Sequence, residues 1–145
     1  MAAKKAFITG IAGFVGSHLV DFLLREHPQI RIVGLMLPNS PTSLLGAIKH
    51  RVEIIEGDLL DANFVGHVFN RVRPEKVFHL AALSAVQDSW SSASETLTNN
   101  IISQCNIFEA LRQLQQKDPK YRPVIQIAGS SDEYGFVKPE EIPIT

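Results

Sequence analysis

The sequence predicts an α/β fold in which helices cover both faces of a parallel sheet. Three observations predict it. Short apolar runs typical of buried strands alternate with segments whose apolar residues recur at helical spacing. The connections between runs are long enough for the right-handed crossover helices that join parallel strands. A glycine-rich turn links the first run to the first helical segment, as in doubly wound sheets.

The first half of the chain is expected to supply three strands and the helices between them. Apolar residues at helical spacing follow the first strand until Pro28, which ends that helix. A loop rich in Pro, Ser and Asn and a short helix separate the second and third strands. Asp61 is the expected N-cap of the next helix, which Pro74 ends. The strands are expected at residues 5–10, 31–36 and 52–55.

The second half repeats the alternation, with strands expected at 76–81 and 124–128 and a long helix at 93–115. Residues 134–145 contain two prolines and no periodic pattern. A sheet that stopped there would leave its last edge uncovered. We therefore expect residues 1–145 to be one incomplete N-terminal domain, without the last strand or strands and without a C-terminal domain.

Composition excludes several classes of protein. Fourteen Lys and Arg against fifteen Asp and Glu leave a net charge of −1, which argues against nucleic acid as a partner. A single cysteine, Cys105, which we expect to be buried in a helix, excludes a disulfide framework. The histidines have no metal-binding spacing, and no apolar run reaches the roughly 20 residues of a membrane span. We expect a soluble cytoplasmic protein without a metal or a membrane partner.

The glycine-rich turn, residues 9–16 (TGIAGFVG), has the sharpest pattern. Gly10 permits a tight turn, Gly13 lets the backbone approach a pyrophosphate, and Gly16 allows close packing of helix on strand. The helix that follows presents unpaired amides and a positive dipole end to phosphate groups. The glycine spacing is one residue longer than the common dinucleotide fingerprint. A structural turn without a ligand is the alternative.

The segment TGIAGFVGSHL resembles the start of the extended short-chain dehydrogenase/reductase family, the nucleotide-sugar epimerases, dehydratases and reductases, which has the Rossmann fold. Later pieces of the chain are similar to that family in the same order. Within it, the chain most resembles the branch of GDP-mannose 4,6-dehydratase and GDP-6-deoxy-4-keto-hexose reductase. The matching pieces are residues 57–59, 78–84, 88–90, 100–101, 129–135 and 138–145.

The resemblance implies that NAD or NADP binds at the glycine turn and along the strand ends. Asp58 and Leu59 would flank the adenine, with a loop-capping role as the alternative for Asp58. Asn100 would brace backbone near the site, or else be a solvated helix residue. The implied coenzyme-binding residues are Gly10, Ala12, Gly13, Phe14, Val15, Gly16, Asn39, Asp58, Leu59, Leu80, Ala81, Ala82 and Asn100.

The end of the second strand does not decide between NAD and NADP. A carboxylate about 20 residues past the glycine turn would hold a ribose hydroxyl, whereas an arginine would accept a 2′-phosphate. Residues 35–40 (LMLPNS) contain neither. Asn39 and Ser40 are able to hydrogen-bond either group, so the coenzyme class stays open.

The resemblance also implies hydride transfer at a sugar carbon. Ser130, with Ser131 as second choice, matches the hydroxyl residue that orients the substrate, and Asp132 matches the acid/base of the dehydratases. The alternatives are a Ser-Ser turn and a solvated acidic turn. Ser84 is expected to approach the sugar.

Tyr134 and Lys138 match the family's Tyr-x-x-x-Lys spacing, but Gly135 and Pro139 disfavour the helix that this pair needs. We therefore expect the catalytic Tyr and Lys to lie outside residues 1–145. The expected function is that of an NAD(P)-dependent nucleotide-sugar dehydratase, epimerase or reductase acting on a GDP-hexose, as a homodimer or tetramer. The alternative is a non-catalytic dinucleotide-sensing module.

Overall fold

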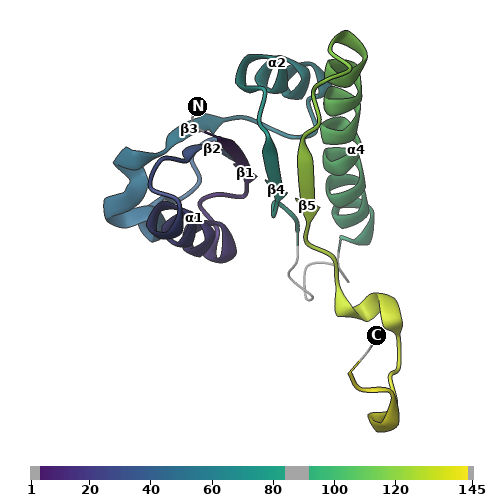
Figure 1. Ribbon diagram of the computed structural model, residues 1–145. Coiled ribbons are helices and arrows are strands. Elements are labelled where there is room, and N and C mark those ends of the chain that lie inside the picture. Colours follow the sequence, from purple (N-terminus) through teal and green to yellow (C-terminus); the bar gives the residue numbers. More distant parts are fainter. Residues whose placement is uncertain (1–3, 84–91, 144–145) are drawn as a thin grey trace.

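The computed structural model, which describes residues 4–83 and 92–143, contains one sheet of five parallel strands (Figure 1). The strand order is β3-β2-β1-β4-β5, which is the doubly wound order. The predicted fold class is therefore confirmed. The strands are β1 (Lys5–Thr9), β2 (Arg31–Met36), β3 (Glu53–Glu56), β4 (Lys76–His79) and β5 (Val124–Ile127).

The chain changes direction across the sheet at β1. From β1 it proceeds outward to β2 and β3, and it then returns to pair β4 with the other side of β1. Phe7 of β1 accordingly lies opposite Val33 of β2 and Val77 of β4. In open α/β sheets, such a switch point leaves a crevice at the carboxyl ends of the two central strands.

Helices cover both faces of the sheet. On one face α1 (Phe14–Glu26) and the 3-10 segment η1 (Ser43–Arg51) enclose a core that includes Ile8. On the other face α2 (Ala62–Val72) and α4 (Ala93–Lys117) pack against each other and against Phe7. Successive residues of β1 thus enter opposite cores, as the pleat requires.

Local chemistry explains most element boundaries. The Asp61 carboxylate accepts a hydrogen bond from the Phe64 amide at 3.0 Å, which confirms the predicted N-cap of α2. β4 ends at His79, two residues earlier than expected, because the next two amides donate to a side chain of β1. The short helix expected after β2 is the 3-10 segment η1, broken at Gly46, whose φ is 41°.

The expected burial of Cys105 is wrong, because this side chain is exposed. Cys105 lies on the outer side of α4. The residues that α4 buries against the sheet and α2 are Ser103, Ile107, Ala110, Leu111 and Leu114. The described helices include none that is long and apolar enough to cross a membrane.

Beyond β5 the chain runs away from the sheet as an extended tail with two short 3-10 turns, η2 (Ser131–Tyr134) and η3 (Pro139–Glu141) (Figure 1). Phe136 in this tail is 91% exposed. No residue that the structure describes in this tail belongs to either core.

Candidate functional site

A cavity of about 320 Å³ opens at the carboxyl ends of the strands, beside the switch point between β1 and β4. It brings together seven of the sequence-predicted residues: Gly10, Ala12, Gly13, Asp58, Leu59, Ala81 and Ala82. Its other lining residues are Leu35, Met36, Leu37, Ser40, Pro41, Gly57, Leu83, Asn99 and Ser103. A cavity of this size, apolar with a few polar groups, is typical of a small-molecule site.

Two glycines of the turn are required by the fold itself. Gly10 has a φ of 68°, and a Cβ there would lie 3.0 Å from the Ala81 nitrogen. A Cβ on Gly16 would lie 2.3 Å from the Gly10 carbonyl oxygen. Gly16 therefore lets α1 approach the turn closely, as predicted, and a larger residue there would displace the helix.

Gly13 differs from these two glycines. It is the N-cap of α1 in an ordinary extended conformation, and no side chain caps the helix. A Cβ on Gly13 would meet only the Gly10 carbonyl oxygen, at 3.2 Å. Phe14 and Val15 begin the helix, and their amides belong to the first turn, whose N–H groups lack intrahelical acceptors. The cavity thus has an uncapped helix N-terminus at its wall, which suits an anion.

The hydroxyl of Thr9 joins the ends of β1 and β4. It accepts hydrogen bonds from the amides of Leu80 and Ala81, each at 3.1 Å, and it lies 2.8 Å from the His79 Nδ1. Since the oxygen accepts from two amides, its proton is donated to Nδ1, and His79 carries its own proton on Nε2. Burial lowers the pKa of His79 and keeps the ring neutral. Sequence reasoning missed this contact, because Thr9 and His79 belong to two separate motifs that lie 70 residues apart.

Asp58 has the loop-capping role that the sequence allowed as an alternative. Its Oδ1 accepts a hydrogen bond from the Leu60 amide at 2.9 Å, which shapes the loop before α2. It also lines the cavity, next to the buried Leu59. A Cβ on Gly57 would lie 2.0 Å from the end of the Phe64 ring, so a larger residue there would require this ring to move.

Asn100 braces the segment that follows β4. Its Oδ1 accepts from the Leu83 amide at 2.8 Å and its Nδ2 donates to the Leu83 carbonyl at 3.0 Å. Asn100 itself is not among the lining residues, whereas Asn99 and Ser103 are. Sequence reasoning missed these two. Their i, i+4 spacing, which places both on one face of α4, was the available signal.

Asn39 occupies a turn outside the cavity. Its φ is 61°, and the turn is closed by a hydrogen bond from the Ser40 amide to the Leu37 carbonyl at 3.2 Å. An asparagine tolerates this left-handed conformation better than most residues. Ser40, the next residue, lines the cavity instead.

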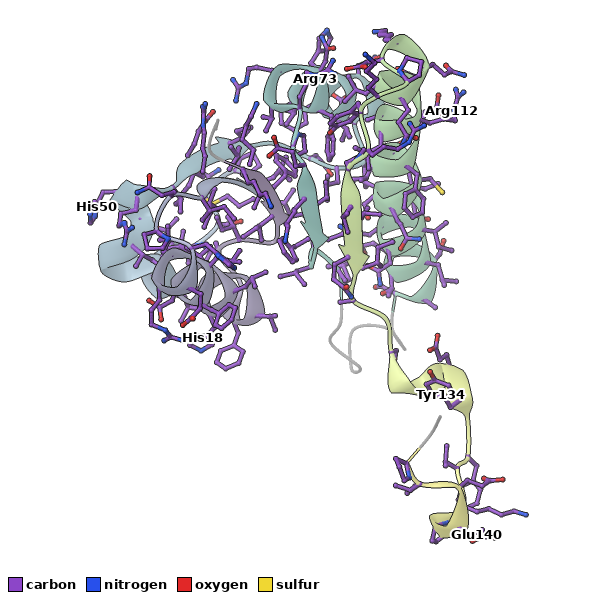
Figure 2. All side chains as sticks on the ribbon, viewed as in Figure 1. His18, His50, Arg73, Arg112, Tyr134 and Glu140 are labelled. Carbon is purple, nitrogen blue, oxygen red and sulfur yellow. The ribbon has the colours of Figure 1, made fainter. Side chains whose placement is uncertain are left out.

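Ser130, the first choice for the catalytic hydroxyl, is not among the described residues that line the cavity. Ser130, Ser131 and Asp132 lie beyond β5 where the tail begins, and Figure 2 shows Tyr134 of this tail away from the sheet. Ser84 lies outside the described residues. Four further residues of the predicted coenzyme site are close in the sequence to lining residues but do not line the cavity themselves. They are Leu80, Phe14, Val15 and Gly16. Among the described residues no three His, Cys, Asp or Glu side chains gather as a metal site would require.

Comparisons with known proteins give the chain a family context. A family model described as "GDP-mannose 4,6 dehydratase" matches residues 7–145. The chain is 29% identical to a UDP-glucose 4-epimerase of Cyamopsis tetragonoloba, covering 98% of this chain and 40% of that protein. It is 34% identical to a GDP-mannose 4,6-dehydratase of Sordaria araneosa, covering 75% of this chain and 20% of that protein. It thus spans well under half of these relatives.

Solved structures agree with the fold. The UDP-glucose 4-epimerase of Bifidobacterium longum, in complex with NAD+ and UDP, superposes with a TM-score of 0.79 at 26% identity. That match covers 98% of this chain and 41% of the epimerase. The Thermus thermophilus UDP-glucose 4-epimerase, complexed with NAD, gives a TM-score of 0.64 at 29% identity, over 75% of this chain and 34% of its own.

Proposed function

This chain belongs to the GDP-mannose 4,6-dehydratase family, and on that premise we propose that it forms the coenzyme-binding part of an NAD(P)-dependent nucleotide-sugar dehydratase, epimerase or reductase. The observation that carries the proposal is the uncapped N-terminus of α1 at Gly13, in the wall of a cavity at the β1/β4 switch point. Ligands of open α/β sheets bind at this place. NAD occupies solved epimerases that share the fold.

Each part of the dinucleotide has a matching part of the cavity. The pyrophosphate would lie against the amides after Gly13, where the helix dipole favours negative charge. Asp58 and Leu59 would flank the adenine, and the small side chains of Ala81 and Ala82 leave room for the nicotinamide-side ribose. The bound coenzyme would supply the hydride acceptor. The residues of this chain would hold it, orient it and exclude water.

For the substrate we propose a GDP-hexose. The description of the matching family and the Sordaria relative support this choice, although relatives of the chain also include dTDP-glucose and UDP-glucose enzymes. Ser130 or Ser131 would orient the sugar hydroxyl, Asp132 would act as acid/base, and Ser84 would approach the sugar. Because the catalytic Tyr and Lys are expected elsewhere, we propose that residues 1–145 are the N-terminal domain of a longer polypeptide.

We also propose that the protein is cytoplasmic and works as a homodimer or tetramer. Exposed apolar side chains on α4, including Leu97, Ile101 and Phe108, support packing of a second copy. Light scattering after size-exclusion chromatography measures the oligomeric state, and a monomer at working concentration contradicts this part. Cell fractionation tests the location.

The test of function uses the intact protein. Calorimetric titration with NADH and NADPH measures coenzyme binding, and incubation with GDP-mannose, UDP-glucose or dTDP-glucose, followed by mass spectrometry, detects loss of water or epimerisation. We expect coenzyme binding and turnover of the GDP-sugar. Failure to bind either coenzyme at millimolar concentration contradicts the proposal. Binding without turnover of any nucleotide sugar favours the dinucleotide-sensing alternative.

A further inference from the structure

The cavity wall at the end of β2 carries no charge. It consists of Met36, Leu37, Ser40 and Pro41. Among the described residues that line the cavity, only Asp58 is ionisable. Asp58 follows β3, and its Oδ1 already accepts from the Leu60 amide. The end of β2 is the place where a doubly wound fold holds the adenosine ribose, with a carboxylate for a free 2′-hydroxyl or an arginine for a 2′-phosphate.

Two side chains of opposite charge, Lys49 and Glu56, contact or pair with residues at this wall without lining the cavity themselves. Lys49 donates a hydrogen bond from Nζ to the Thr42 hydroxyl at 3.2 Å, one residue beyond Pro41. Glu56 ends β3 directly opposite Met36. Both side chains are exposed, so solvent and salt screen their fields. Neither side chain lines the cavity, and neither therefore supplies a charge within its wall.

Ser40 is the one polar side chain of this wall. A serine hydroxyl accepts a hydrogen bond from a ribose hydroxyl or donates one to a phosphate oxygen. Unlike aspartate, it does not repel a phosphate, and unlike arginine, it does not attract one by charge. The same residue thus accommodates both forms of the ribose.

On the basis of the proposed function, we infer that the neutral wall at the end of β2, with Ser40 as its polar group, makes the site accept NAD and NADP alike. The two dissociation constants are expected to agree within about tenfold, which corresponds to a difference in binding free energy below about 1.4 kcal/mol.

The test is titration of the intact protein with NADH and with NADPH at one ionic strength. Ser40→Asp is expected to raise the dissociation constant of NADPH by about tenfold or more, since it sets a carboxylate against the 2′-phosphate. The dissociation constant of NADH is expected to change by less than about threefold. Ser40→Arg is expected to lower the dissociation constant of NADPH by about tenfold. Ser43→Asp is the matched control, because Ser43 begins η1 and does not line the cavity; it should alter the ratio of the two constants by less than about threefold.

Each outcome of these titrations either supports or overturns the inference. A ratio within tenfold for the natural protein, shifted in opposite directions by the two Ser40 variants, supports the inference. A preference above tenfold for either coenzyme in the natural protein overturns it, even if a Ser40 variant fails to fold. Equal effects of Ser40→Asp and Ser43→Asp overturn the role of Ser40. Binding of neither coenzyme overturns the proposed function, and this inference with it.

Discussion

The hydroxyl of Thr9, next to the cavity, makes hydrogen bonds with three partners. Replacing Thr9 by Val keeps the shape but leaves the amides of Leu80 and Ala81 without their acceptor and His79 without its donor. Each unsatisfied buried group costs about 1–3 kcal/mol. We expect Thr9→Val to lower the free energy of unfolding by about 2–4 kcal/mol in urea denaturation. Thr9→Ser, which keeps the hydroxyl, is the control, and equal stability of the two variants would contradict the assignment.

His79 gives the protein a stability that depends on pH. Burial lowers its pKa in the folded state below the ordinary 6.5. As the pH falls through the ordinary pKa of 6.5, the unfolded chain binds a proton that the folded protein does not bind. The folded state therefore loses stability until the pH reaches the pKa of His79 in the folded protein. We expect the melting temperature to decrease between about pH 7.5 and about pH 5.5. His79→Asn, which retains an acceptor for Thr9, should show a smaller decrease, and an unchanged decrease would exclude His79 as the cause.

At the scale of elements, the start of α2 depends on a single cap. The Asp61 carboxylate accepts from the Phe64 amide and thereby satisfies one of the free donors at the helix N-terminus. We expect Asp61→Ala to destabilise the protein by about 1 kcal/mol in urea denaturation. Asp61→Asn should lose much less, because asparagine caps as well as aspartate. A loss for Asn as large as for Ala would indicate that the charge, and not the cap, stabilises the helix.

Elements with a strong local pattern could be predicted from the sequence. The strand Arg31–Met36 has the predicted bounds, and the cap at Asp61 and the left-handed Gly10 agree with expectation. The turn at Asn39 could not be predicted, because an asparagine is suited both to hydrogen-bond a coenzyme and to adopt the left-handed conformation of a turn. The network around Thr9 joins residues 70 apart in the sequence, and a local pattern carries no signal for such a contact.

At the scale of the whole molecule, apolar surface outside both cores is the dominant feature. Val124 at the sheet edge is 66% exposed, Leu97 on α4 is 59% exposed and Phe136 in the tail is 91% exposed. We expect residues 1–145 expressed on their own to aggregate, or to bind a dye for apolar surfaces and unfold without a sharp transition. Calorimetry and dye fluorescence measure this. A sharp, reversible thermal transition would contradict it.

The doubly wound parallel sheet could also be predicted from the sequence, since alternating strands and crossover helices leave few topologies. The position of Ser130, Ser131 and Asp132 relative to the cavity could not. They follow the last strand in a tail of which no described residue belongs to either core, and a motif alone does not supply the contacts that would fix such a segment. Their catalytic role remains a proposal.

The measurement that bears most directly on the account is coenzyme affinity after Gly13→Val in the intact protein. A Cβ there would lie 3.2 Å from the Gly10 carbonyl oxygen, whereas a Cβ on Gly16 would lie 2.3 Å from the same atom, so the melting temperature should fall less for Gly13→Val than for Gly16→Val. We predict that Gly13→Val weakens NADH and NADPH by at least about tenfold, because the added methyl groups occupy the approach of the pyrophosphate to the α1 amides. Unchanged affinity for both coenzymes in a folded Gly13→Val protein would contradict the account.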